Sequence, residues 1–211
     1  MKSRALLLLS GGIDSPVAGW LASKKAEVIA LHFSNKEFAG TESIEKARKI
    51  AKKLKFKKFI VLDLSQALKE IAEKCDNAYY FVLQRRLFFK IAEKVAEKEK
   101  CDFICTGDSI GQVSSQTLAN MAVISRASGK TIARPLLCFN KLETTRIAEK
   151  IGTFELSKGP EMCDVLGPKH PSTRARLERV LEEESKIDLK AITEKAFASA
   201  CKKWALPFNQ A

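Results

Sequence analysis

The sequence contains no apolar run that approaches the roughly 20 residues needed to cross a bilayer. Apolar residues 5–9 follow a charged start, but they are too few for a signal peptide and lead into a glycine turn instead of a cleavage site. Internal repeats and low-complexity segments are also lacking, and 211 residues suit one large domain. We therefore expect a cytoplasmic protein without a membrane partner.

The cysteine spacing that is typical of zinc sites is absent as well. The six cysteines are scattered and form no repeated Cys-x-x-Cys, which argues against a structural zinc site. In the reducing cytoplasm we expect them to be thiols, with any disulfide transient and catalytic. Cys101 and Cys105 flank or lie within an apolar stretch, so burial is their default explanation.

Acidic residues are fewer than basic ones: the chain has 25 Asp and Glu and 37 Lys and Arg, which gives a net charge of +12. An excess of this size suits a polyanionic partner, and nucleic acid is the leading candidate. A lysine-rich solvated surface is the alternative, and charge alone weighs the two about equally.

Continuous apolar runs alternate with amphipathic stretches along most of the chain. The runs are typical of buried parallel strands, and the stretches between them are typical of crossover helices. The pattern predicts an α/β fold, a doubly wound and mostly parallel sheet of about five strands whose carboxyl ends share one rim. We expect residues 1–171 to form this domain and two helices in residues 172–211 to extend it. The predicted strands are 5–9, 27–33, 59–64, 102–107 and 131–137, and the predicted helices before the extension are 16–25, 41–54, 66–74, 79–98 and 141–150.

One short turn, residues 10–15, stands between the first strand and the first helix and reads Ser-Gly-Gly-Ile-Asp-Ser. Its glycines let a ligand approach the main chain, and the Ser10 and Ser15 hydroxyls with the following helix start favour a phosphate. Asp14 would repel phosphate unless a divalent cation lies between them, so it indicates magnesium. The turn has neither the P-loop Gly-Lys-Ser/Thr ending nor the third glycine of the dinucleotide fingerprint. A plain strand-to-helix turn is the alternative.

The turn resembles the pyrophosphatase loop (PP-loop) of adenylating enzymes that cleave ATP between its α and β phosphates. Residues 106–120 are similar to the most distinctive segment of the tRNA 4-thiouridine synthases, the tRNA uridine sulfurtransferases of the ThiI type of thiamine biosynthesis. Residues 134–137 with Lys141, then 151–153 and 160–163, continue the family pattern in the expected order. The resemblance implies the adenine nucleotide alpha hydrolase-like fold.

The resemblance implies ATP and Mg²⁺ as the cofactors, with Asp14 acting through magnesium. Asp108 directly follows the fourth predicted strand, so it is a candidate to hold magnesium or to orient the leaving group. His32 is interpreted as a pocket wall and not as a catalytic base, because no acidic partner lies near it in the sequence. Arg85 and its neighbour Arg86 point about 100° apart on a helix, so only one need face the site. The residues predicted to bind the nucleotide are Leu8, Leu9, Ser10, Gly11, Gly12, Asp14, Ser15, His32, Phe33, Arg85, Gly107, Asp108 and Gln116.

The reaction implied by the resemblance begins when the O4 of a tRNA uridine attacks the α-phosphorus of ATP and pyrophosphate leaves. Sulfur then replaces AMP at C4 to give 4-thiouridine. Asp14, Lys141 and Cys163 are the predicted catalytic residues, and Lys141 stands at a helix start where a cation opposes the dipole, which favours a ligand-facing role. Cys163 matches the family cysteine that attacks or resolves the incoming persulfide and forms a transient disulfide, for which Cys105 and Cys138 are weak partner candidates.

Many family members carry an RNA-binding THUMP module before the PP-loop, and some carry a rhodanese module after the catalytic domain, whereas only nine residues precede the loop here. We therefore expect tRNA as the substrate and a separate THUMP-type protein as a candidate helper. The expected sulfur source is a cysteine desulfurase persulfide, a rhodanese-type carrier, free sulfide or a metal cluster. Two alternatives stay open: a PP-loop ligase or amidating enzyme for a small molecule, and a nucleotide-binding subunit of a split RNA-modifying complex.

Overall fold

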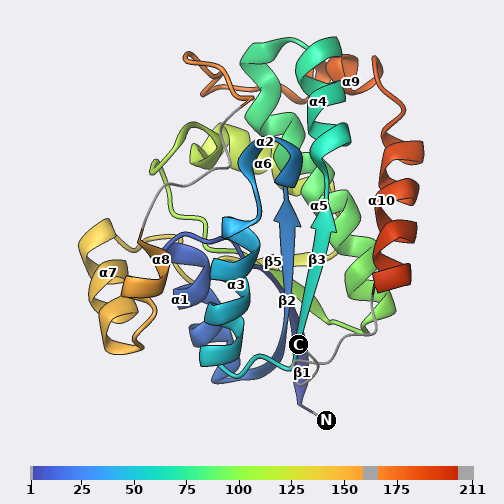
Figure 1. Cartoon of the computed structure of the whole chain (residues 1–211). Helices are drawn as coiled ribbons and strands as arrows, with labels where there is room; N and C mark the ends of the chain where they lie inside the picture. The colour runs from blue at the N-terminus through green and yellow to red at the C-terminus, as the bar shows by residue number, and fades with distance from the viewer. Residues whose placement is uncertain (1, 159–165, 204–211) are drawn as a thin grey trace.

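A five-stranded, all-parallel sheet forms the centre of the molecule in the computed structural model, which describes residues 2–158 and 166–203 (Figure 1). The strand order is β3-β2-β1-β4-β5. This confirms the predicted doubly wound α/β fold. The strands are β1 (Ser3–Leu8), β2 (Ala26–Ser34), β3 (Lys58–Asp63), β4 (Phe103–Cys105) and β5 (Thr131–Ala133).

Helices cover both faces of the sheet. One face carries α1 (Asp14–Ser23), α3 (Glu42–Lys53), α7 (Lys141–Lys150) and α8 (Phe154–Ser157), and the other carries α4 (Ser65–Lys74), α5 (Tyr80–Lys98), α6 (Leu118–Ser125), α9 (Leu177–Glu184) and α10 (Leu189–Lys203). The four-residue helix α2 (Lys36–Ala39) follows β2 directly. Figure 1 shows α10 running beside β3 and α5, which it contacts.

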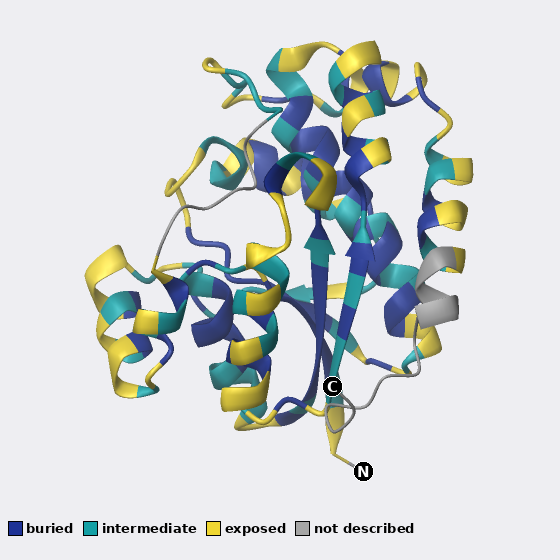
Figure 2. Cartoon of the chain, viewed as in Figure 1, coloured by how far each residue is buried: buried dark blue, intermediate teal, exposed yellow. Residues whose placement is uncertain are grey.

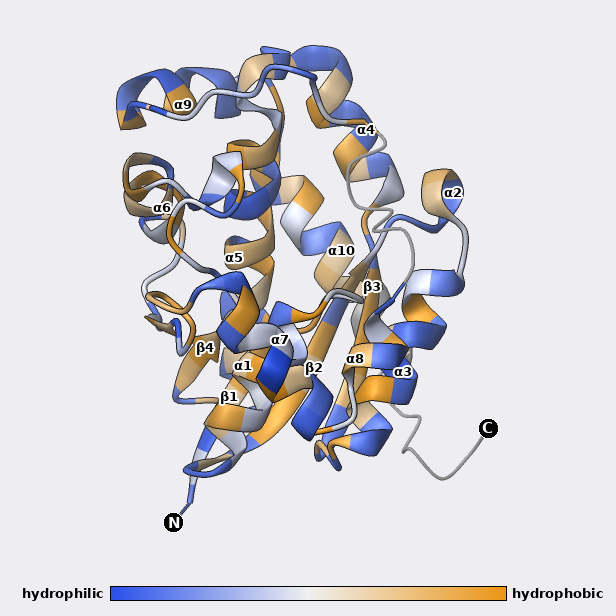
Figure 3. Cartoon of the chain, turned by 90° about the vertical axis from the view of Figure 1, so that its left-hand side faces the viewer, coloured by the Kyte–Doolittle hydropathy of each residue, from blue (hydrophilic) through white to orange (hydrophobic). Residues whose placement is uncertain are grey.

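The alternation of side chains along the strands divides the core into two clusters. Leu6 and Leu8 of β1 pack with the helices of the α5 face, whereas Ala5 and Leu7 pack with the helices of the α1 face. Both strand faces are therefore apolar and buried, as Figure 2 shows for β1 and β2, and as the hydropathy colouring of Figure 3 shows along the same strands. This explains why the strands appear in the sequence as continuous apolar runs.

Some predicted element boundaries were wrong. The fifth strand ends at Ala133, because Arg134 and Pro135 begin a turn, and helix α1 begins at Asp14 and not at Pro16. The sequence pattern missed helices α2, α6 and α8, since four to eight residues are too few for a clear 3.6-residue period. The predicted boundary at residue 171 stays a prediction.

Strand β1 is the point where the strand order reverses. The chain passes from β1 outward to β2 and β3, then returns to place β4 and β5 on the other side of β1. In open α/β sheets a ligand binds outside the carboxyl ends of the strands at such a reversal. No helix among residues 2–158 and 166–203 is both long and apolar enough to span a membrane.

Candidate active site

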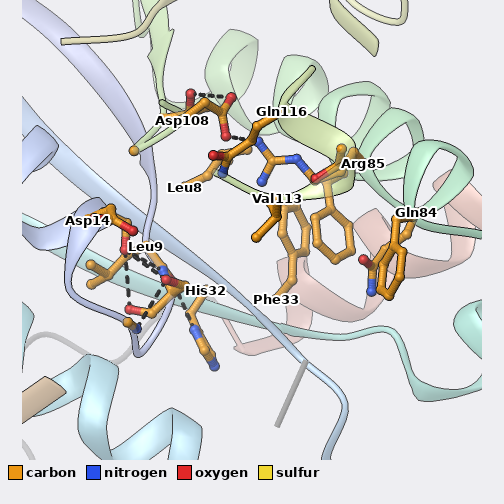
Figure 4. A pocket seen from close by; sticks show the side chains of 18 of the residues that line it. Leu8, Leu9, Asp14, His32, Phe33, Gln84, Arg85, Asp108, Val113 and Gln116 are labelled. Atoms are coloured by element: carbon orange, nitrogen blue, oxygen red, sulfur yellow. Dashed lines mark hydrogen bonds and ion pairs between the residues drawn. The ribbon is translucent and has the colours of Figure 1, made fainter. Parts of the chain in front are cut away.

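A pocket of about 390 Å³ opens at the carboxyl ends of β1, β2 and β4 (Figure 4). Its volume lies within the usual range for small-ligand sites. The residues from the sequence analysis that line the pocket are Leu8, Leu9, Ser10, Gly12, Asp14, Ser15, His32, Phe33, Arg85, Gly107, Asp108, Gln116 and Lys141. Gly11 belongs to the loop but does not line the pocket, and Cys163 lies outside the described residues.

The two serines of the PP-loop hold the turn in shape. The hydroxyls of Ser10 and Ser15 lie 3.0 Å apart, and the Ser15 hydroxyl accepts from the Ser10 amide at 2.9 Å. The Ser10 hydroxyl in turn accepts from the Gly12 amide at 3.2 Å. Helix α8 adds a further contact, because the Ser157 hydroxyl donates to the Gly12 carbonyl at 3.4 Å. The hydroxyls predicted to contact phosphate therefore also stabilise the conformation of the loop.

The start of helix α1 has the features of an anion cradle. Among the residues that the structure describes, no hydrogen bond involves the amides of Gly11, Ile13 or Asp14. Ile13 occupies the N-cap, and its side chain cannot cap the helix. A phosphate at this position would accept hydrogen bonds from the amides and would also be stabilised by the helix dipole.

Asp14 and Lys141 meet at the mouth of the pocket, although 127 residues separate them. The Lys141 ammonium lies 3.1 and 3.2 Å from the two carboxylate oxygens of Asp14, and the Gln112 amide donates to Asp14 at 3.0 Å. Lys141 is the first residue of α7, whose N-cap Asn140 and Glu143 form a reciprocal capping box. The predicted place of Lys141 at a helix start is confirmed, and its charge points at the PP-loop.

Gly107 lets the loop after β4 lie directly against the PP-loop. A Cβ atom at this residue would stand 2.6 Å from the Ser15 nitrogen and 2.7 Å from the Asp14 carbonyl carbon. Both neighbours are backbone atoms of the first turn of α1, so neither can rotate away. Only glycine permits this approach, and it brings Asp108 and Gln116 to the same pocket as the phosphate cradle.

One face of α5 lines the opposite side of the pocket from the PP-loop (Figure 4). Phe81, Gln84, Arg85 and Phe88 are spaced by three and four residues, which places them on one stripe of the helix. Phe88 stacks on Phe33 of β2 with ring centroids 4.3 Å apart. The sequence analysis identified only Arg85 and Phe33 here, although the helical spacing of the other three was a usable signal.

Arg86 faces away from the pocket, as predicted for one of the two neighbouring arginines. Its guanidinium donates to both carboxylate oxygens of Glu184, at 2.6 and 3.1 Å, and to the Val123 carbonyl at 2.6 Å. The pair is buried against α9 and α6, which leaves Arg85 to face the pocket.

His32 forms part of the pocket wall. The residue is 3% exposed, and Nδ1 donates to the Leu9 carbonyl at 2.8 Å, because a carbonyl can only accept. Burial lowers the pKa of His32 more than this hydrogen bond raises it. No described residue contacts Nε2 by a hydrogen bond. These contacts support the predicted wall position, and among the described residues no acidic side chain hydrogen-bonds to the ring, which argues against a role as a base.

The lowered pKa of His32 predicts that acid destabilises the fold. Between the ordinary histidine pKa near 6.5 and the lower folded value, the unfolded chain binds more protons, so stability is complete above 6.5 and declines below it. We expect the free energy of unfolding in urea to fall by up to about 1.4 kcal/mol per pH unit in this range. His32→Gln should remove most of this slope, and the exposed His170→Gln should keep it. An equal slope in both variants would contradict the prediction.

Asp108 does not fit the magnesium role predicted for it. Its carboxylate accepts hydrogen bonds from Arg85 at 2.5 Å, Thr106 at 2.8 Å and Arg134 at 3.2 Å, and the residue is 4% exposed. Burial alone would raise the pKa of Asp108, but the charges of Arg85 and Arg134 and the Thr106 hydrogen bond lower it overall. Asp108 is buried and already paired with two arginine cations, so a further cation is not favoured at its carboxylate, whereas the Asp14 side chain is 22% exposed and pairs with one lysine.

Asp14 does fit as a ligand of a magnesium ion that is bound together with the phosphates of a nucleotide. Mg²⁺ is commonly held by one or two carboxylates together with substrate phosphates and water, not by an all-protein cage. Asp14 lies beside the anion cradle, and the described residues contain no group of three or more potential metal ligands. A bound cation would have to displace Lys141 from at least one carboxylate oxygen, since Lys141 contacts both of them.

The two cysteines considered as partners for Cys163 differ in access. Cys105 is fully buried at the end of β4, and burial raises the pKa of its thiol to about 12. Cys138 is exposed in the loop after β5. Access favours Cys138 over the buried Cys105.

Comparisons with known proteins agree with the geometry of the pocket. A family profile described as thiamine biosynthesis protein (ThiI) matches residues 1–189. A probable tRNA sulfurtransferase of Alkaliphilus oremlandii is 42% identical over 203 residues, covering 92% of this chain and 52% of the relative. A solved 4-thiouridine synthetase in complex with RNA and bound ATP matches with a TM-score of 0.89 and 35% identity, covering 93% of this chain and 54% of that one.

A more distant structure, the NMN synthetase of Francisella tularensis, has a TM-score of 0.59 at 15% identity and shows a shared fold alone. The chain spans about half the length of the tRNA sulfurtransferase and of the 4-thiouridine synthetase that it matches.

Proposed function

The chain belongs to the ThiI family, and on this premise we propose that it is the ATP-using catalytic part of a tRNA sulfurtransferase that makes 4-thiouridine. Support comes from the relatives aligned over most of this chain, which are named probable tRNA sulfurtransferases. Further support comes from the 35% identical neighbour, a 4-thiouridine synthetase solved with RNA and ATP. The resemblance and the fold expected from the sequence are thereby confirmed.

The observation that carries the proposal is the division of the pocket into two ends. The PP-loop amides, Asp14 and Lys141 form a polar end suited to phosphates, and the Phe33 and Phe88 stack with Leu8 forms an apolar end suited to a nucleobase (Figure 4). A nucleoside triphosphate has this same distribution of charge along its length. We therefore propose ATP as the ligand, with its phosphates on the PP-loop.

In the proposed first step the O4 of a tRNA uridine forms a bond to the α-phosphorus of ATP, and the bond from that phosphorus to the bridging oxygen of pyrophosphate breaks. Negative charge grows on the leaving pyrophosphate, where the loop amides and the Lys141 ammonium stabilise it. Magnesium, when bound at Asp14, supplies further charge neutralisation there. In the second step a sulfur nucleophile bonds to C4, the bond from C4 to the former O4 breaks, and AMP departs with that oxygen. When the nucleophile is a persulfide, a thiol then bonds to the donor's inner sulfur, the S–S bond breaks, the thiouridine is released and a disulfide is left.

The net charge of +12 supports a polyanionic substrate such as tRNA. A cysteine desulfurase persulfide, a rhodanese-type carrier or free sulfide remain the proposed sulfur donors, and a separate THUMP-type protein remains the proposed helper for tRNA binding. These partner assignments rest on the family relationship.

Pyrophosphate release in the presence and absence of tRNA tests the proposed function. We expect ATP and sulfide to yield pyrophosphate and thiolated uridine only when unmodified tRNA is added, detected by nucleoside mass spectrometry. Fully thiolated tRNA is the matched control, since its target position offers no O4 nucleophile. Pyrophosphate release at the same rate without RNA would instead favour a ligase or amidating enzyme for a small molecule.

Replacing Cys163 separates the two proposed steps. Cys163→Ala should keep tRNA-dependent pyrophosphate release, because Asp14 and Lys141 are unchanged, and should lose thiolation when a protein persulfide is the donor. Cys138→Ala tests the exposed candidate partner in the same assay, and Cys105→Ala is the buried control. Full persulfide-dependent thiolation by Cys163→Ala would refute the assignment.

A further inference from the structure

We propose that Asp108 is a positioning residue that holds the Arg85 guanidinium at the nucleobase end of the pocket. The proposal rests on the proposed function only in taking an adenine nucleotide as the ligand. It assigns to Asp108 a role different from metal binding, and to Arg85 a role at the base and not at the phosphates.

The first observation is the arrangement of donors around Asp108. One carboxylate oxygen accepts from Arg85 Nη2, and the other accepts from the Thr106 hydroxyl and from Arg134 Nε. Arg134 is itself fixed, because its Nη2 donates to the Ser125 hydroxyl of α6 at 2.8 Å. Asp108 is therefore anchored by the loop after β4 and by the turn after β5, and it extends one oxygen towards α5.

The second observation is the position of Arg85. Its side chain is 23% exposed and lines the pocket, whereas the Asp108 side chain beneath it is 5% exposed. Figure 4 shows Arg85 near Phe33, Val113 and Gln84, on the side of the pocket away from Asp14. Its Cζ also lies 5.6 Å from the centroid of the Phe89 ring. One edge of the guanidinium is thus occupied by Asp108, and the group borders the apolar end.

The third observation is electrostatic. Asp108 shares its negative charge between Arg85 and Arg134, so it offsets part of the positive charge of Arg85, and Arg85 attracts a triphosphate less than an unpaired arginine would. A planar guanidinium held along one edge still presents its face, and such a face stacks well on an aromatic ring. Lys141, whose partner Asp14 lies beside the PP-loop, is the cation placed for the phosphates.

The test measures binding of AMP without metal and of inorganic tripolyphosphate with magnesium, each by calorimetry. We expect Asp108→Asn to weaken AMP binding in EDTA about tenfold, since a charge-assisted hydrogen bond that orients Arg85 is lost. Tripolyphosphate binding should be unchanged. Arg85→Ala should weaken AMP similarly, and the double variant should be no weaker than either single one, because both changes remove the same contact.

The neighbouring pair of Arg86 on α5 and Glu184 on α9 supplies a matched control, because it is also a buried arginine and carboxylate but faces away from the pocket. Glu184→Gln should lower the unfolding temperature and leave AMP binding unchanged. If Asp108→Asn is too unstable to study, Arg134→Lys provides a second variant, since it disturbs the anchor of Asp108 and should weaken AMP but not tripolyphosphate.

Two results would overturn the inference: AMP binding that is unaffected by Asp108→Asn, or additive losses in the double variant. A loss confined to magnesium and tripolyphosphate would instead restore the metal-ligand role of Asp108. A wild-type chain that binds neither AMP nor ATP would overturn the proposed function itself, and this inference with it.

Discussion

Asp14→Ala is expected to reduce tRNA-dependent pyrophosphate release by at least about 100-fold, comparable to the loss of one preorganised charge-stabilising group in other active sites. Asp14 lies in the first turn of α1, beside the amides proposed to hold phosphate, and it orients both Lys141 and Gln112. Its removal leaves the Lys141 ammonium without its carboxylate partner and removes the proposed magnesium contact. The loss should therefore fall on the rate of the chemical step, and ATP binding should change less.

A matched control for Asp14 stands at the opposite edge of the sheet. Asp102 precedes β4, and its carboxylate accepts from the Arg4 amide at 2.8 Å, far from the carboxyl ends of the strands. Asp102→Ala should leave pyrophosphate release unchanged. Thermal unfolding of both variants shows whether they are folded. A rate for Asp14→Ala within a few-fold of the wild type, under saturating ATP and magnesium, would refute the proposed role.

Gly107→Ala is expected to disrupt both the fold and the nucleotide site. The new Cβ would overlap backbone atoms of Asp14 and Ser15, at 2.7 and 2.6 Å, so the loop after β4 and the PP-loop must separate. Overpacking of this kind costs about 1–3 kcal/mol, which urea unfolding measures. ATP binding should weaken further than this instability explains, because the separation moves the phosphate cradle away from Asp108 and Gln116.

Gly129→Ala is the control for Gly107. A Cβ at Gly129 would meet only the end of the Glu93 side chain, at 3.0 Å, and that side chain can rotate. The Gly129→Ala variant should therefore retain nearly full stability and ATP binding. Wild-type ATP affinity in Gly107→Ala would show that the two loops tolerate a larger separation than the structure implies.

Local sequence pattern was sufficient for the fold and for the parts of the site that adjoin the strands. Apolar runs located all five strands, since a strand buried on both faces requires side chains of this kind at every position. Parallel strands place their carboxyl ends at one edge, so the PP-loop, His32 and Gly107 were expected to meet there, and all three line the pocket. Element ends were less certain, as the early end of β5 at Ala133 illustrates.

The ion pairs across the pocket could not be predicted from the sequence. Asp108 was predicted to bind magnesium because a carboxylate after a strand end suits that role, but its contacts come from α5 and from the turn after β5. These partners lie 23 and 26 residues away in the sequence, and local periodicity does not predict which distant side chains will contact Asp108. The same holds for Asp14 and Lys141, which are 127 residues apart.

The sequence by itself therefore determined the α/β sheet, the PP-loop and the family, because these depend on residue spacing along one segment or on a motif read in order. Only the tertiary structure decided that Arg86 pairs with Glu184 and that Asp108 pairs with two arginines. The physical reason is range: backbone periodicity is set by neighbouring residues, whereas an ion pair forms only when packing brings distant segments within about 4 Å.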